Sequence, residues 1–136
     1  MIIKSYEIQK KISNFLKHNL FLLYGENDGL KKDIRESIKI KINQQDNHTE
    51  FLSFYENDII TNEENFFNSI YSGSLFSKKK IITINNATDK IIEQLKDILS
   101  KHPENVFLII FAGILEKKSK LRYLFETDSK TLCIPF

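Results

Sequence analysis

Apolar residues along the chain fall into two alternating kinds of segment: short apolar runs, and longer stretches with an apolar residue at every third or fourth position. The short runs are rich in aliphatic and aromatic side chains, and the clearest of them are unbroken rather than alternating. An unbroken run of this length is typical of a strand buried on both faces of a parallel sheet. We therefore predict strands over residues 20–24, 51–55, 81–84, 106–112 and 131–134.

Between these runs, apolar residues recur at helical spacing. The spacing predicts helices over residues 6–16, 30–42, 66–71, 91–99 and 121–125. Asp28 is placed to cap the second helix, and Thr61 and Glu64 have the spacing of a capping box ahead of the third. The third helix should end near residues 72–73, and Pro103 should close the fourth.

Strands and helices alternate along the whole chain. Such alternation is typical of right-handed βαβ crossovers, in which helices pack on both faces of a mainly parallel sheet. With 136 residues and a mass of 16.0 kDa, the chain has the length of one ordinary domain, and it shows no internal repeat or Pro/Gly-rich linker. We predict a single three-layer α/β domain over residues 1–136, with a sheet of about five strands.

Composition and charge limit the kinds of partner that we expect the chain to bind. The 20 Lys and Arg against 18 Asp and Glu give a formal net charge of only +2, whereas a domain that neutralises phosphates usually carries a strong basic excess. The most apolar stretch, around residues 106–112, is about half as long as a membrane-spanning helix. The first residues lack the apolar region of a signal peptide, and the single cysteine, Cys133, is expected to be a buried apolar residue. These features predict a cytoplasmic protein without a membrane partner.

A glycine turn follows the first predicted strand, at the position where many α/β proteins cradle phosphates. A working P-loop has the pattern G-x-x-x-x-G-K-[ST], in which the Lys reaches the terminal phosphates and the hydroxyl holds Mg²⁺. Here Gly25 and Gly29 are one residue too close, Leu30 follows Gly29, and no Ser or Thr follows Lys31. We predict a degenerate phosphate-loop turn, made of Gly25, Gly29 and Lys31, that binds no nucleotide.

The second half of a nucleotide site is missing from the sequence as well. A P-loop enzyme needs an acidic residue at the end of a neighbouring strand to orient Mg²⁺, but the third predicted strand leads into Asn85 and Asn86. The histidines, His18, His48 and His102, lack the spacing of metal ligands, and nothing resembles a nucleophile with its base. We predict no metal, no cofactor and no catalytic residues.

Two large apolar residues, Leu75 and Phe76, stand side by side in a loop of small polar residues between the third helix and the third strand. Adjacent residues cannot both join one helical stripe, and the glycine and serines around them favour a turn. The residues alone leave two interpretations open. The turn projects the pair toward a partner, or the ring of Phe76 packs under the edge of the sheet.

Three short segments occur in an order and at a spacing that can be compared with known families. They are Phe-Leu-Leu-Tyr-Gly-Glu at residues 21–26, Ser-Leu-Phe-Ser-Lys-Lys at residues 74–79 running into the third strand, and Lys-Lys-Ser-Lys-Leu at residues 117–121. Together they resemble the N-terminal domain of the delta subunit of the bacterial DNA polymerase III clamp loader. The resemblance implies a P-loop-like, AAA+-like domain without functional Walker motifs, in agreement with the motifs missing above.

The resemblance also implies a partner and the residues that bind it. In that family a Leu-Phe pair fills a hydrophobic pocket on the β sliding clamp and helps to hold the ring open, and the matching residues are Leu75 and Phe76, preceded by Ser74. Gly73 stands where some relatives carry a larger apolar residue, so Tyr71 is the candidate for an additional contact. The family normally carries a further helical domain and a collar that contacts the other clamp-loader subunits, and these 136 residues include neither.

Two alternative functions of the chain remain open. The first is weak or indirect DNA contact through a lysine surface, although lysines at strand junctions usually form a solvated face. The second is a degenerate P-loop NTPase-like module that only mediates protein interactions. The lysines concerned are Lys78, Lys79, Lys80, Lys117, Lys118 and Lys120.

Overall fold

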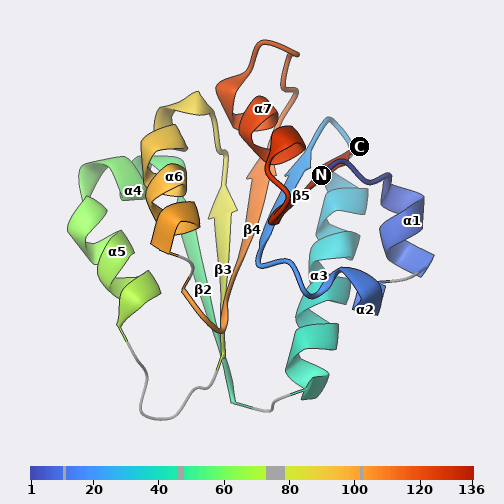
Figure 1. Cartoon of the computed structure of the whole chain (residues 1–136), viewed down its shortest axis with the longest axis horizontal. Coiled ribbons are helices and arrows are strands. Elements are labelled where there is room, and N and C mark those ends of the chain that lie inside the picture. The colour runs from blue at the N-terminus through green and yellow to red at the C-terminus, as the bar shows by residue number, and fades with distance from the viewer. Residues whose placement is uncertain (11, 46–47, 73–78, 102) are drawn as a thin grey trace.

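Five strands form one sheet at the centre of the computed structural model, which describes residues 1–10, 12–45, 48–72, 79–101 and 103–136 (Figure 1). The strands are β1 (Leu20–Tyr24), β2 (Thr49–Tyr55), β3 (Lys79–Asn85), β4 (Val106–Ala112) and β5 (Thr131–Pro135). Their order across the sheet is β2-β3-β4-β1-β5, and every neighbouring pair is parallel. The predicted parallel sheet is confirmed.

Helices cover both faces of this sheet. One face carries α1 (Ser5–Lys10), α2 (Ile12–Phe15) and the long helix α3 (Asp28–Gln45) (Figure 1). The opposite face carries α4 (Glu56–Thr61), α5 (Glu63–Tyr71), the 3₁₀ turn η1 (Asp89–Ile91), α6 (Ile92–Lys101) and α7 (Lys120–Thr127). The three-layer architecture predicted from the alternation of elements is therefore confirmed.

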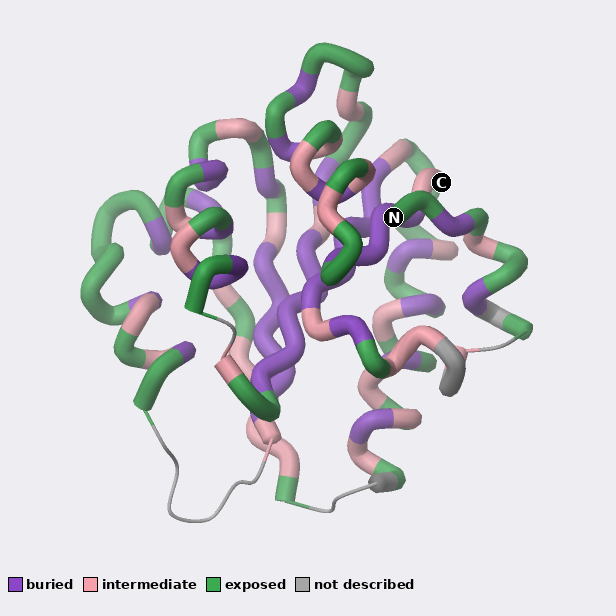
Figure 2. Tube along the Cα trace, viewed as in Figure 1, coloured by how far each residue is buried: buried purple, intermediate pink, exposed green. Residues whose placement is uncertain are grey.

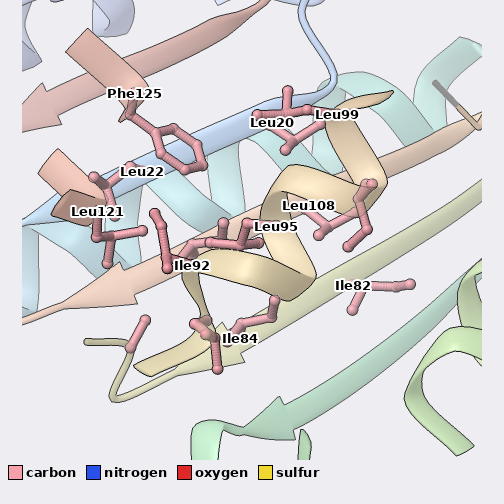
Figure 3. Close-up of a cluster of buried hydrophobic side chains, with 14 of the residues drawn as sticks. Leu20, Leu22, Ile82, Ile84, Ile92, Leu95, Leu99, Leu108, Leu121 and Phe125 are labelled. Atoms are coloured by element: carbon pink, nitrogen blue, oxygen red, sulfur yellow. The ribbon is translucent and has the colours of Figure 1, made fainter. Parts of the chain in front are cut away.

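The hydrophobic core consists of two layers, one on each face of the sheet. Along β1, Leu20, Leu22 and Tyr24 face the layer that contains α4 to α7, whereas Phe21 and Leu23 face the layer that contains α3. Successive side chains of a strand point to opposite faces, so one unbroken apolar run fills both layers. Figure 2 shows the buried positions concentrated along the strands, and Figure 3 shows side chains of α6 and α7 packed against those of β1, β3 and β4.

Two helix starts differ from the sequence predictions. The cap of α3 is Asn27, whose amide oxygen accepts a hydrogen bond of 3.0 Å from the backbone N–H three residues on, and Asp28 is the first helical residue. The predicted capping box of Thr61 and Glu64 is wrong, because Thr61 ends an additional helix, α4, and Asn62 caps α5. In both places a neighbouring Asn reaches the free N–H groups of the first turn, as this residue commonly does.

Cys133 is buried in β5, as predicted, and burial raises the pKa of its thiol to about 12. The thiol is therefore protonated at neutral pH. Over the ranges that the structure describes, no helix combines the length and apolarity needed to cross a membrane.

Candidate functional site

The carboxyl ends of β1 and β4 flank the crevice in which parallel α/β proteins bind their ligands. The chain leaves β1 toward α3 on one face of the sheet and leaves β4 toward α7 on the other (Figure 1). Ligands bind at such a topological switch point, with phosphates against a helix N-terminus. A pocket of about 480 Å³ opens here, lined by residues of α3 and of the ends of β2, β3 and β4.

The ammonium of Lys31 belongs to this pocket but is already engaged by protein atoms. Its Nζ donates to the carbonyl oxygens of Gly25 and Ala112, each at 2.9 Å, and lies 3.0 Å from a carboxylate oxygen of Asp28. An ammonium has three N–H donors, and these three acceptors use all of them. The lysine therefore joins the end of β1 to the end of β4.

Gly25 closes the turn in a conformation that favours glycine. Its φ is 123°, and a Cβ at this position would lie 2.0 Å from the carbonyl oxygen of Phe136. Its N–H donates to the carbonyl of Gly113 at 2.9 Å, whereas the N–H groups of a phosphate loop must point at the ligand. Gly29, the second glycine of the predicted turn, lies within the first turn of α3.

The end of β3 supplies amides to the crevice rather than carboxylates. Asn85 donates from Nδ2 to the hydroxyl of Ser53 at 3.0 Å and to the carbonyl of Phe54 at 3.1 Å. Asn86 follows in the left-handed conformation, with a φ of 57°. Among the described residues, no group of three or more His, Cys, Asp or Glu is placed to hold a metal ion. The side chains of Lys31 and Asn85 at this crevice are thus hydrogen-bonded to other groups of the protein.

A second group of candidate residues lies where α5 ends. The hydroxyl of Tyr71, the last residue of α5, donates to Oδ2 of Asp97 on α6 at 3.0 Å. Its ring stacks on Phe67, with the ring centres 6.0 Å apart, and the ammonium of Lys101 lies 4.9 Å from the ring centre. Burial and the hydrogen bond to Asp97 raise the pKa of Tyr71 to about 12. Tyr71 thus ties the end of α5 to α6 while part of its side chain remains exposed.

The segment 73–78 lies outside the described residues, and it contains the candidates Ser74, Leu75 and Phe76 together with Lys78. The described chain stops just after α5 and resumes with the first residue of β3.

Lys80 is buried at the start of β3, so the prediction that it belongs to an exposed lysine surface is wrong. Its Nζ donates to the carbonyl oxygens of Ser69 at 2.8 Å and of Ser72 at 2.6 Å. These carbonyls stand at the C-terminal end of α5, where a helix leaves unpaired acceptors and a partial negative charge. The neighbouring Lys79 is half-buried. This burial of Lys80 could not be predicted from the run of lysines, because no local pattern shows which of their side chains turns inward.

The other predicted lysines, Lys117, Lys118 and Lys120, lie before and at the start of α7. Lys118 pairs with Glu116 at 3.4 Å. Together with Lys96 of α6, the three lysines line a groove of about 440 Å³, whose walls also include Ile92 and the exposed ring of Tyr123. The described residues that line this groove include four lysines and no acidic residue, so the groove is basic with an aromatic wall.

The N-terminus of α7 is capped by a carboxylate that the sequence analysis missed. Asp89 of η1 accepts hydrogen bonds from the hydroxyl of Ser119 at 2.8 Å and from the N–H groups of Lys120 at 3.1 Å and Leu121 at 3.0 Å. The bond from Leu121, and then those from Ser119 and Lys120, lower the pKa of Asp89. The sequence around the start of α7 does not predict these hydrogen bonds, because Asp89 is far from Ser119, Lys120 and Leu121 along the chain.

Comparisons with known proteins point to one family. The family model of the DNA polymerase III delta subunit matches residues 21–134. A solved structure, the Bacillus subtilis DNA clamp loader delta protein (YqeN), is similar with a TM-score of 0.65 and 11% sequence identity, over 97% of this chain and 42% of that one. No curated protein matches the chain. The structural likeness supports the fold, and because the family model covers most of the sequence, the chain belongs to the DNA polymerase III delta subunit family.

Proposed function

We propose that this chain binds the β sliding clamp of DNA polymerase III and helps to open the ring when the clamp is loaded during DNA replication. Leu75 and Phe76 make the central contact, with Ser74 and Tyr71 beside them. The observation that carries the proposal is family membership together with the Ser-Leu-Phe sequence ahead of β3. The similar B. subtilis structure is named a clamp loader delta protein, which supports the same proposal.

The proposed contact is a small apolar plug. Burial of a large apolar side chain contributes about 1.5–3 kcal/mol, and a few such anchors carry most of the energy of an interface. Tyr71 stands at the described border of the segment, with its ring braced by Phe67 and its hydroxyl held by Asp97. Such a fixed, partly exposed ring is suited to extend an apolar contact.

The proposed role is that of a binding module rather than an enzyme. The acceptors around Lys31 use all three of its donors, and the N–H of Gly25 is hydrogen-bonded within the protein. Both observations support a nucleotide-independent role for the crevice, because a working phosphate loop needs these groups for its ligand.

Calorimetry with the β sliding clamp from the same organism tests the proposal. We expect saturable binding by the unaltered chain and a loss of affinity of about a hundredfold or more for the double variant Leu75→Ala, Phe76→Ala. The matched control is Ile114→Ala, Tyr123→Ala, which removes two exposed apolar side chains elsewhere and should bind normally. Circular dichroism checks that each variant is folded. Absence of binding by the unaltered chain, or equal binding by the Leu75, Phe76 variant, would overturn the proposal.

DNA contact is the second candidate function, and the basic groove at α6 and α7 favours it. Lys96, Lys117, Lys118 and Lys120 lie around one groove, beside a tyrosine ring on which a base can stack. If the groove binds DNA, affinity should fall steeply with salt and should fall again in Lys117→Ala, Lys120→Ala. Clamp binding through an apolar plug should change little with salt.

We further propose that this chain is the AAA+-like N-terminal domain of a longer cytoplasmic delta subunit. The similar B. subtilis protein is more than twice as long as the stretch matched here, which supports further domains. Contacts with the other clamp-loader subunits would then depend on those domains. Mixing this chain with the other subunits and following the mixture by size-exclusion chromatography should therefore show no stable complex.

A further inference from the structure

Another pocket lies at the opposite end of β1 from the crevice. It has a volume of about 430 Å³ and opens between the first residue of β1, Leu20, the last turn of α6 and the turn that precedes β5. Its apolar side consists of Leu20 and Leu99, both of which are buried. Its polar side consists of Lys17, His18, Asn19, Ser129 and Lys130. The pocket therefore joins an apolar wall to cations and hydrogen-bonding groups.

The imidazole of His18 is buried in the wall of this pocket with one nitrogen unused. The residue is only 7% exposed, and Nε2 has no hydrogen-bond partner among the residues that the structure describes. Buried polar atoms ordinarily have a partner, because burial removes them from water. A half-turn of the ring about its Cβ–Cγ bond exchanges nitrogen and carbon positions without changing the volume that the ring fills. The unused nitrogen can therefore turn to bond a group that enters the pocket.

The charged groups that shift the pKa of His18 are cations. Burial lowers this pKa, an interaction with the backbone of Lys130 acts in the opposite direction, and the charges of Lys17 and of the N-terminal ammonium lower it further. The imidazole is therefore neutral at neutral pH, a form that offers one hydrogen-bond donor and one acceptor. The described residues that line the pocket include two lysines and no acidic residue. An anion that both accepts and donates hydrogen bonds matches this set.

We propose that this pocket binds a phosphate group, either as inorganic phosphate or as the phosphate of a small monoester. Lys17 and Lys130 balance its negative charge, through charge-assisted bonds that are stronger than neutral ones. Asn19 and Ser129 donate to its oxygens, and the unused nitrogen of His18 bonds another oxygen. Hydrogen phosphate carries both P–O⁻ acceptors and a P–OH donor, so it can pair with this nitrogen whether or not the nitrogen carries a hydrogen. The inference is independent of clamp binding.

Titration with inorganic phosphate, followed by NMR at constant pH and with NaCl holding the ionic strength, tests the proposal. We expect saturable shifts of the His18 ring signals and of the backbone amides of Asn19 and Ser129. A parallel titration with glycerol 3-phosphate separates the two sources of the group. Tighter binding of the ester assigns the pocket to an organic phosphate, and equal or weaker binding assigns it to free phosphate. Shifts that do not saturate with either compound would overturn the inference.

Variants assign the binding to this pocket. His18→Phe keeps a ring and removes both nitrogens, so saturable binding should be lost, and Lys17→Met should weaken it by about threefold to tenfold. Lys10→Met, which removes an exposed lysine at the end of α1 and outside the pocket, is the control and should bind normally. Because Nε2 of His18 has no described partner, His18→Phe should melt no lower than the unaltered chain without phosphate.

Should His18→Phe lack a cooperative unfolding transition, His18→Leu replaces it, with the same expected loss of binding. Equal phosphate affinities of the His18 variant and the unaltered chain would overturn the inference, and so would equal affinities of Lys17→Met and Lys10→Met.

Discussion

Lys31 holds the ends of β1 and β4 together through a buried ammonium. Replacing it by Met leaves the carbonyls of Gly25 and Ala112 without their donor, and such a loss costs about 1–3 kcal/mol. We therefore expect Lys31→Met to lower the free energy of unfolding by that amount, measured by urea denaturation. The neighbouring Lys32 is exposed, so Lys32→Met should change stability by no more than about 0.5 kcal/mol. Equal stabilities of the two variants would contradict this role of Lys31.

Gly25 and Gly113 form a matched pair of glycines in the same crevice. A methyl group at Gly25 would meet the backbone oxygen of Phe136 and would be held at a φ of 123°, so Gly25→Ala should destabilise the chain by about 1–3 kcal/mol. A Cβ at Gly113 meets nothing within 4 Å, and Gly113→Ala should be neutral or slightly stabilising. Thermal unfolding of both variants tests the pair. Similar melting temperatures would mean that the turn at Gly25 is less constrained than its contacts indicate.

At the scale of elements, the start of α7 is held both by its N-cap Ser119 and by hydrogen bonds to Asp89 of η1. Because the pKa of Asp89 lies below its ordinary value of 3.8, the ionised carboxylate stabilises the fold above that pH, and this contribution is lost as the pH falls through the lowered pKa. Asp89→Asn should lower the free energy of unfolding at pH 7 by about 1 kcal/mol, as expected for a weakened helix cap. The difference from the unaltered chain should shrink as the pH falls below 3.8 and through the lowered pKa of Asp89.

The exposed Asp33 on α3 provides the control for this pH dependence. Asp33→Asn removes a carboxylate without a described capping role and should show a small difference in stability at both pH values. Urea denaturation at neutral and acidic pH gives both comparisons. A difference for Asp89→Asn that stays constant with pH would show that packing, rather than the charge, accounts for its effect.

The helical period of the sequence predicted α6, whereas the short helix α4 was missed. Residues 91–99 show the helical period clearly, and Leu95 and Ile98 are fully buried as the pattern requires. Helix α4 was missed because it follows β2 directly and offers only Ile59 and Ile60, of which Ile59 alone is buried. A period cannot be recognised in so short a segment.

The candidate site also has some features that the sequence predicts and others that it does not. That the turn lacks the motif of a phosphate loop can be read from the sequence, because this motif depends on a local spacing that Gly25 and Gly29 do not satisfy. The hydrogen bonds of Lys31 and Asp89 were not predictable, because Lys31 reaches Ala112 and Asp89 reaches Ser119 across the fold. Local sequence patterns show which motifs the chain contains, and only the tertiary arrangement shows how distant residues are bonded to one another.

At the scale of the whole molecule, polar groups at the carboxyl ends of β1 and β4 are bonded to other atoms of the protein. A carboxylate and two carbonyls contact the ammonium of Lys31, and the carbonyl of Gly113 accepts a hydrogen bond from the N–H of Gly25. In a working phosphate loop, a bound ligand would be the partner of these groups. Here the fold should be equally stable with and without nucleotide.

Thermal unfolding with and without MgATP tests this independence. A site with a Kd one hundredfold below the nucleotide concentration would add about 2.7 kcal/mol of stability, which is a shift of several degrees for a domain of this size. We expect a shift of less than about 1 °C in this chain at about 1 mM MgATP, because binding would require Lys31 to give up its three acceptors. An ATPase domain with an intact P-loop, measured in parallel, should show the larger shift. A saturable rise in melting temperature for this chain would mean that the crevice opens to nucleotide and that the internal contacts of Lys31 are exchangeable.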